Sequence, residues 1–107
     1  AEQVNAAHRG GHRVIAVGTT VVRALETSVG ADGTSGAYDG WTDLVISPEH
    51  GVKLTDGMVT GWHEPASSHL MMLEAITGRE LLRDSYRAAV AQGYRWHEFG
   101  DVHLILP

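Results

Sequence analysis

Three short stretches of the sequence contain residues that could do chemistry. The first holds Gly18, Thr19 and Thr20, which follow an apolar run and open a helical pattern. Backbone N–H groups at the start of a helix, with hydroxyls beside them, can hold an anionic group. The other stretches hold His63, whose imidazole titrates near neutral pH and can carry a proton, and Asp101, a carboxylate directly before an apolar run. Together these residues could bind an anion and transfer a proton.

Each stretch also has a purely structural interpretation, which the residues alone leave open. The segment 18–20 could be a capped turn between a strand and a helix, and it has neither the dinucleotide-binding nor the P-loop glycine pattern. His63 could hydrogen-bond to the backbone of a turn, with Glu64 competing for its role in proton transfer. Asp101 could simply form a turn.

No metal is expected from this sequence. The chain has no cysteine, and His63 and His69 are six residues apart with Pro65 between them, which is not the H-E-x-x-H spacing of a zinc site. His97 and His103 lie in a segment that suits ordinary surface or core positions, so no role is assigned to them.

The surrounding patterns predict the elements that must position these residues. Val14–Val17 is an unbroken apolar run, which predicts a strand covered on both faces, and a helix follows it to about Thr27. Gly30–Gly40 is rich in Gly, Asp and Ser and predicts a surface loop. The same reasoning predicts a helix ending at Arg9, strands at Leu44–Ile46, Val52–Leu54, Met58–Thr60 and Val102–Leu106, and helices over Leu70–Thr77 and Arg79–Gln92.

This alternation of strands and helices predicts an α/β fold, layered α/β/α around a mostly parallel or mixed sheet. A chain of 107 residues fits one domain. It begins without methionine, in what reads as the middle of a helix, so we expect a fragment of a larger α/β domain.

Composition narrows the class of protein. A chain without cysteine is typical of a reducing compartment, and no apolar run is long enough to span a bilayer, so we expect a cytoplasmic protein with no membrane partner. The net charge of −5 argues against broad nucleic-acid binding. Arg79, Arg83 and Arg87 recur at helical spacing, which could meet phosphates but better fits a solvated face with local ion pairs.

Six motifs, taken in order, resemble one known family. They are RVIAVGTTVVRALE, GWTDLVIS, LTDGMVTGWHEP, LMMLEAITGRE, YRAAV and YRWHEFGDVHLI, and they cover almost the whole chain. In this order and approximate spacing they resemble the C-terminal part of the S-adenosylmethionine:tRNA ribosyltransferase-isomerases of queuosine biosynthesis.

The resemblance implies a transferase that moves and isomerises the ribosyl part of S-adenosylmethionine onto 7-aminomethyl-7-deazaguanine in tRNA, giving epoxyqueuosine. It implies that residues 1–107 form the C-terminal portion of the α/β domain, with a barrel-like domain upstream. The partners would be tRNA and the missing N-terminal part of the polypeptide, and the fragment alone would be inactive. The alternative is a non-catalytic or divergent S-adenosylmethionine-binding module of the same fold with another acceptor.

The resemblance also implies residues that bind S-adenosylmethionine, which would serve as co-substrate. Gly18, Thr19, Thr20 and Arg23 match the family pattern G-T-T-x-x-R and could hold an anionic group. Trp41, in the G-W-T motif, offers a flat surface on which adenine could stack.

From the matched patterns we infer that His63 and Asp101 are the catalytic residues. His63 matches the histidine of N-F-H-x-P and is predicted to carry the proton, and Asp101 matches the Y-G-D pattern and is predicted to be its partner or a substrate ligand. The chain departs from the family patterns at Gly61 and Trp62, which leaves the acceptor open. The prediction requires that the three stretches meet at one pocket.

Overall fold

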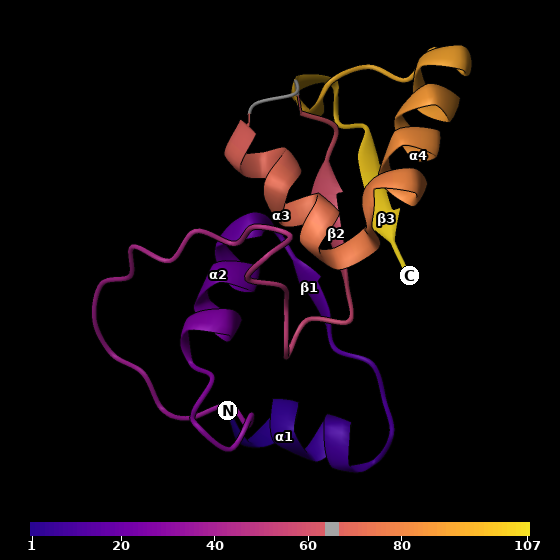
Figure 1. Ribbon diagram of the computed structural model, residues 1–107. Coiled ribbons are helices and arrows are strands. Elements are labelled where there is room, and N and C mark those ends of the chain that lie inside the picture. The colour runs from indigo at the N-terminus through magenta and orange to yellow at the C-terminus, as the bar shows by residue number, and fades with distance from the viewer. Residues whose placement is uncertain (64–66) are drawn as a thin grey trace.

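The computed structural model describes residues 1–63 and 67–107 and shows a small sheet with β2 between β1 and β3 (Figure 1). The elements in chain order are α1 (Glu2–Arg9), β1 (Ile15–Val17), α2 (Thr19–Thr27), β2 (Gly57–Gly61), α3 (Ser67–Thr77), α4 (Arg79–Ala91), the 3-10 helix η1 (His97–Phe99) and β3 (Val102–Ile105). The predictions made for Glu64 and Pro65 lie outside the described residues. No helix in the described ranges is long and apolar enough to cross a membrane.

The sheet is mixed, which confirms the predicted α/β class. β1 runs parallel to β2, with Val17 paired to Val59, and β3 runs antiparallel to β2, with Gly61 paired to Val102. The first residues of β3 therefore lie beside the last residues of β2. The carboxyl ends of β1 and β2 and the amino end of β3 thus share one edge of the sheet.

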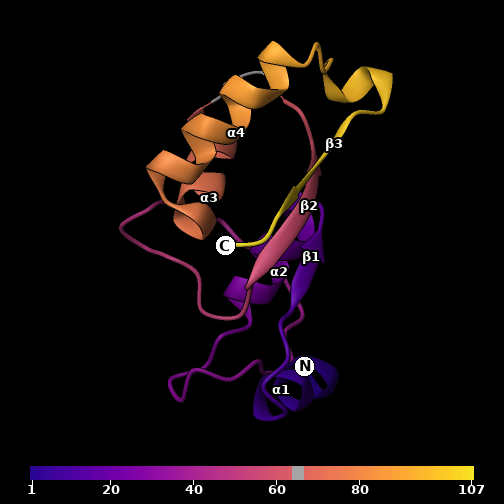
Figure 2. The ribbon, with the colours of Figure 1, turned by 90° about the vertical axis from the view of Figure 1, so that its right-hand side faces the viewer.

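The two faces of this sheet differ in burial. Ala16, Met58 and Ile105 are buried on one face, whereas Val17 and Leu104 on the other are exposed. Figure 2 shows α3 and α4 on one side of the sheet, and no described element lies against the other. The prediction that the strand at Val14–Val17 is covered on both faces is therefore wrong for the described chain, because helices cover a single face.

The core fills the space between the covered face and the helices. α3 is apolar nearly all round, as predicted, and buries Met72, Leu73 and Ile76, while α4 contributes Leu82. Each fully buried side chain of this size stabilises the fold by roughly 1.5–3 kcal/mol. The α3–α4 pair is thereby fixed against the strands that carry the predicted site residues.

The two predicted strands at Leu44–Ile46 and Val52–Leu54 are wrong, since both segments run as irregular chain. Each segment still buries an apolar side chain, Ile46 in the first and Leu54 in the second, and both are nearly inaccessible. The segment Val52–Leu54 forms no strand because its neighbourhood contains a buried carboxylate of α2, that of Glu26. Glu26 accepts hydrogen bonds from three successive backbone N–H groups, those of Lys53, Leu54 and Thr55, at 2.8, 2.9 and 2.9 Å. These groups are thus satisfied without a neighbouring strand.

Candidate functional site

Residues from three segments meet at the shared edge of the sheet. The N–H of Gly18 donates to the carbonyl of Val59 at 2.9 Å, which places the start of α2 beside β2. On the other side of β2, the N–H of Trp62 donates to the carbonyl of Asp101 at 3.3 Å. His63 is the next residue, so the Gly18 turn and Asp101 flank the point at which His63 leaves the sheet.

The start of α2 is an open helix N-terminus. Gly18 has φ 94° and ψ 153°, a conformation that favours glycine, and no side chain of the described residues caps the helix. A Cβ built on Gly18 would meet no atom of residues 1–63 or 67–107 within 4 Å, which leaves room there for a ligand to approach the backbone.

Arg23 provides a second donor near this turn. It lies one helical turn after Thr19, on the same side of α2. In the described part of the chain, the Nε atom of Arg23 is buried and has no hydrogen-bond partner. An unsatisfied guanidinium nitrogen beside a helix N-terminus is an arrangement that can hold a carboxylate or phosphate.

Three imidazole rings gather beyond the end of β2, and we call them the histidine cluster. The ring of His63 stacks on that of His97 with centroids 3.9 Å apart and lies 4.5 Å from the ring of His69 on α3. The N–H of His97 donates to the carbonyl of Trp62 at 2.7 Å. A Cβ on Gly61 would lie 2.5 Å from the Cβ of His97, so glycine at this position is what permits the stack.

The surroundings of His63 and His69 favour the neutral form of these two rings. Burial, and then repulsion from the ring of His97, lower the pKa of His63 below its ordinary value, and the Glu98 carboxylate opposes this shift only in part. Burial, followed by repulsion from His63, lowers the pKa of His69. A neutral imidazole at neutral pH can accept a proton. Within residues 1–63 and 67–107, no three His, Asp or Glu side chains are grouped to hold a metal ion.

Aromatic side chains support the cluster from behind. The ring of Trp62 stacks on His103 at 4.0 Å with an interplanar angle of 8°, and Tyr86 meets Trp62 edge-on at 4.9 Å. The hydroxyl of Tyr86 donates to the carbonyl of His63 at 3.2 Å. Burial lowers the pKa of His103 and raises that of Tyr86. These contacts fix the backbone of His63.

The carboxylate of Asp101 contacts the chain that leads to η1. Its Oδ2 atom accepts the backbone N–H of Arg95 at 2.5 Å, which ties the residues before η1 to the start of β3. This bond agrees with the turn interpretation of Asp101. It links Asp101 to His63 through the loop that carries His97, and the carboxylate does not bond to the His63 ring.

Trp41 is not brought to the sheet edge with the other predicted residues. Its side chain is 98% exposed. The hydroxyl of its neighbour Thr42 lies 2.8 Å from that of Thr27, the last residue of α2. Trp41 therefore lies beside the opposite end of α2 from Gly18.

The roles of His97 and Glu26 were not predicted from the sequence. His97 is far along the chain from His63, so no local spacing could reveal the stack, and Gly61 shows its importance only once the two segments meet. Glu26 had a usable signal, because it falls four residues after the buried Val22 on the apolar side of α2.

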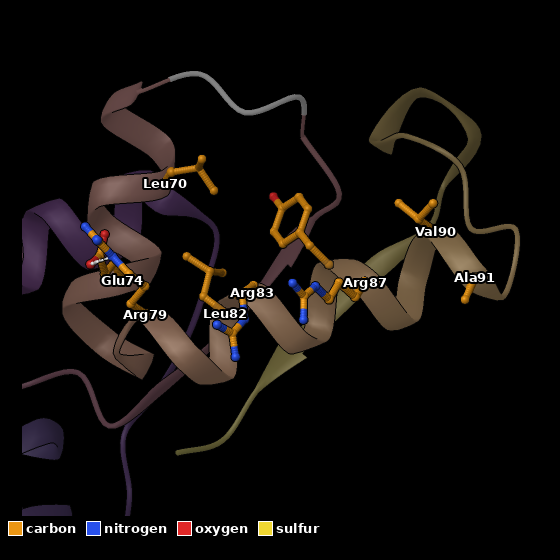
Figure 3. A pocket seen from close by; sticks show the side chains of 9 residues that line it. Leu70, Glu74, Arg79, Leu82, Arg83, Arg87, Val90 and Ala91 are labelled. Carbon is orange, nitrogen blue, oxygen red and sulfur yellow. Dashed lines mark hydrogen bonds and ion pairs between the residues drawn. The ribbon is translucent and has the colours of Figure 1, made fainter.

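A separate groove of about 650 Å³ lies between α3 and α4 (Figure 3). Its floor is apolar and arginines line its rim. The Nε of Arg79 pairs with Glu74 at 3.0 Å and that of Arg83 with Asp84 at 3.2 Å. These local ion pairs favour the solvated-face interpretation of the arginine stripe.

The mixed α/β sheet brings the start of α2, His63 and Asp101 to one edge, which is where ligands of open α/β sheets usually bind. A family model described as "Queuosine biosynthesis protein" matches residues 1–105, and the chain belongs to this family.

Individual relatives agree with this assignment. The S-adenosylmethionine:tRNA ribosyltransferase-isomerase of Moorella thermoacetica is 52% identical over 106 residues, and that of Desulfitobacterium hafniense is 43% identical, each match covering 99% of this chain. The crystal structure of S-adenosylmethionine tRNA ribosyltransferase from Thermotoga maritima superposes with a TM-score of 0.85 at 41% identity, covering 98% of this chain and 37% of that one. The chain spans 31% of the length of the two enzymes.

Proposed function

We propose that this chain is the C-terminal portion of the α/β domain of an S-adenosylmethionine:tRNA ribosyltransferase-isomerase acting in the cytoplasm. The enzyme would transfer and isomerise the ribosyl moiety of S-adenosylmethionine onto 7-aminomethyl-7-deazaguanine in tRNA. The observation that carries the proposal is the meeting of an open helix N-terminus and a neutral imidazole at one sheet edge. The family membership of the chain gives this edge its substrate class. A preceding part of the polypeptide, with a barrel-like domain, would complete the site.

The start of α2 would bind the carboxylate of S-adenosylmethionine. The N–H groups after Gly18 point out of the helix and carry the positive end of its dipole, which favours an anion by about 0.3–1 kcal/mol. The hydroxyls of Thr19 and Thr20 and the unpartnered Nε of Arg23 would add directed donors.

His63 would remove a proton from a carbon beside the sulfonium. In this step the C–H bond breaks, an N–H bond forms on the imidazole, and the electron pair stays on the carbon next to the positive sulfur. The lowered pKa of His63 supports this role, because the ring must be neutral before it accepts the proton. Asp101 would act by holding the loop that stacks His97 on His63.

The test is release of adenine from S-adenosylmethionine by the full-length polypeptide in the presence of tRNA. Loss of a general base is worth roughly 10²–10⁴-fold in rate, so His63→Ala should lower adenine release by that factor. His50→Ala, which removes an exposed histidine bonded to a neighbouring carbonyl, is the control and should be active. Undiminished adenine release by His63→Ala would contradict the catalytic assignment.

A second measurement separates binding from chemistry. Arg23→Ala should weaken S-adenosylmethionine binding in calorimetry. Trp41→Ala should weaken S-adenosylmethionine binding less than Arg23→Ala does, because the Trp41 indole is exposed and lies beside the opposite end of α2 from Gly18. Binding without adenine release in the unmodified protein would favour the non-catalytic binding module.

A further inference from the structure

A small pocket with aromatic walls lies beside the histidine cluster. Its volume is about 170 Å³, and it is lined by Trp62, Tyr86, Ala89, Val90, Tyr94, Arg95 and Trp96. This volume is well below the roughly 300–1,000 Å³ of sites for drug-sized ligands. The pocket therefore suits a single flat ring system.

Three exposed aromatic side chains follow one another on the stretch of chain that closes one side of this pocket, which we call the aromatic segment (Tyr94–Phe99); Tyr94 and Trp96 line the pocket and Phe99 lies just beyond it. Tyr94 is 55% exposed, Trp96 37% and Phe99 64%. The guanidinium of Arg95 lies 5.2 Å from the centroid of the Phe99 ring. Exposed apolar side chains gathered in one place mark a binding surface more often than isolated ones do.

The aromatic segment is held in place before any ligand arrives. The N–H of Tyr94 donates to the carbonyl of Ala89 at 3.0 Å, and that of His97 donates to Trp62 at 2.7 Å. The Asp101 carboxylate holds the N–H of Arg95 between these two points. A prearranged surface loses little conformational freedom on binding, which favours affinity.

Charge decides which ligand fits this surface. With a net charge of −5, the chain lacks the excess of cations that attracts a duplex through its phosphates. Stacking of a base on an aromatic ring needs no net charge and contributes about 1–3 kcal/mol per base. Only an unpaired base can turn out of its strand to reach such a ring.

We propose that the pocket between Trp62, Tyr86, Tyr94 and Trp96 binds one unpaired RNA base by stacking, with Arg95 at its mouth contacting the adjacent phosphate. The proposal rests on the proposed function for the identity of the RNA, a loop of the tRNA acceptor. The aromatic segment lies next to His63, because its residue His97 stacks on the His63 ring.

The experiment titrates the protein with a seven-nucleotide single-stranded RNA of mixed sequence and follows the indole N–H signals by NMR. The same RNA annealed to its complementary strand is the control, because its bases are paired. We expect the signals of Trp62 and Trp96 to shift with the single strand and to shift much less with the duplex. No shift of either signal at millimolar RNA, or equal shifts with the duplex, would overturn the proposal.

Variants of one pocket residue complete the test. Trp96→Ala should weaken binding of the single strand about tenfold, a loss of about 1.4 kcal/mol, within the range for one stacked base. Trp96→Phe keeps an aromatic ring and should keep most of the affinity. As the control, Leu81→Ala removes an exposed apolar side chain outside the pocket and should leave the affinity for the single strand unchanged. If Trp96→Ala does not fold, two other variants test the proposal. Trp96→Phe should keep most of the affinity, and Arg95→Gln should weaken both the binding and its dependence on salt. Because this assay contains no S-adenosylmethionine, its failure is distinguishable from a failure of adenine release.

Discussion

The two ends of β2 use polar groups in opposite ways. Before β2 begins, the carboxylate of Glu26 is 5% exposed and accepts three backbone N–H groups. After β2 ends, His63 stacks on another imidazole, and its neighbour His69 has a buried Nε2 without a partner among the described residues. A buried carboxylate that accepts three N–H groups stabilises the fold, whereas a buried ring nitrogen without a partner costs free energy, as unsatisfied polar atoms at functional sites often do.

The largest expected effect is at the structural end. Glu26→Ala leaves the buried N–H groups of Leu54 and Thr55 without acceptors, each worth about 1–3 kcal/mol, and also frees the part-buried N–H of Lys53, so the free energy of unfolding should fall by at least about 2 kcal/mol. This is a large share of the roughly 5–15 kcal/mol that stabilises a domain. Urea unfolding followed by circular dichroism measures it.

Glu26→Gln is the matched control, since it keeps the shape and one acceptor oxygen and should lose less stability than Glu26→Ala. A loss below about 1 kcal/mol for Glu26→Ala would mean that water replaces the carboxylate. The contrast between the two ends of β2 would then disappear.

The second effect is at the chemical end. In Gly61→Ala the new methyl group would meet the Cβ of His97 at 2.5 Å, so we expect His97 to be displaced at a cost of about 1–3 kcal/mol. The pKa of His63 should rise, because the neighbouring charge and part of the burial are lost. Unfolding and NMR titration measure the two results. Gly36→Ala, whose Cβ would make an ordinary 3.6 Å contact, should be nearly silent.

A smaller effect on stability is expected from His97→Phe. Phenylalanine keeps a flat ring on His63 but carries no charge, so stability should change by less than about 1.5 kcal/mol. The pKa of His63 should rise by loss of repulsion, yet stay below its ordinary value because burial remains. NMR titration checks this, with the exposed His12→Phe as control. An unchanged pKa of His63 would show that burial alone sets it.

The smallest effect concerns pH. Burial lowers the pKa of His103 in the folded chain from the ordinary value of 6.5, so the unfolded chain binds more protons as pH falls through this value. The free energy of unfolding should therefore decrease as pH falls through about 6.5 and level off below the folded pKa. In His103→Phe the decrease should be shallower. Melting curves at several pH values test this, and parallel pH profiles would speak against it.

The sequence predicted those parts of the structure that depend on neighbouring residues. The apolar run before Gly18 and the helical period after it predicted the β1–α2 unit, and the periods of α3 and α4 predicted both helices. The strand at Val52–Leu54 failed because its N–H groups bond to Glu26, a partner from another element. The exposure of Val17 also depends on what covers the sheet, which a run of apolar residues does not reveal.

The candidate site was predictable only in part for the same reason. The sheet topology brings Gly18, His63 and Asp101 to one edge, as expected from residues placed at strand ends. The stack of His97 on His63 depends on the missing Cβ of Gly61. The 98% exposure of the Trp41 side chain depends on the course of a long loop. Contacts between distant segments are set by the folded backbone, so they produce no regular residue spacing in the sequence from which they could be predicted.

The central place of β2 has a consequence for how such a domain can grow. β1 and β3 are the outer strands of the described sheet, and each has one row of backbone groups facing away from β2. New strands can be added at either margin while both neighbours of β2 stay the same. Enlargement of the sheet beyond β1 or β3 would then leave both neighbours of β2, the strand that leads to His63, unchanged.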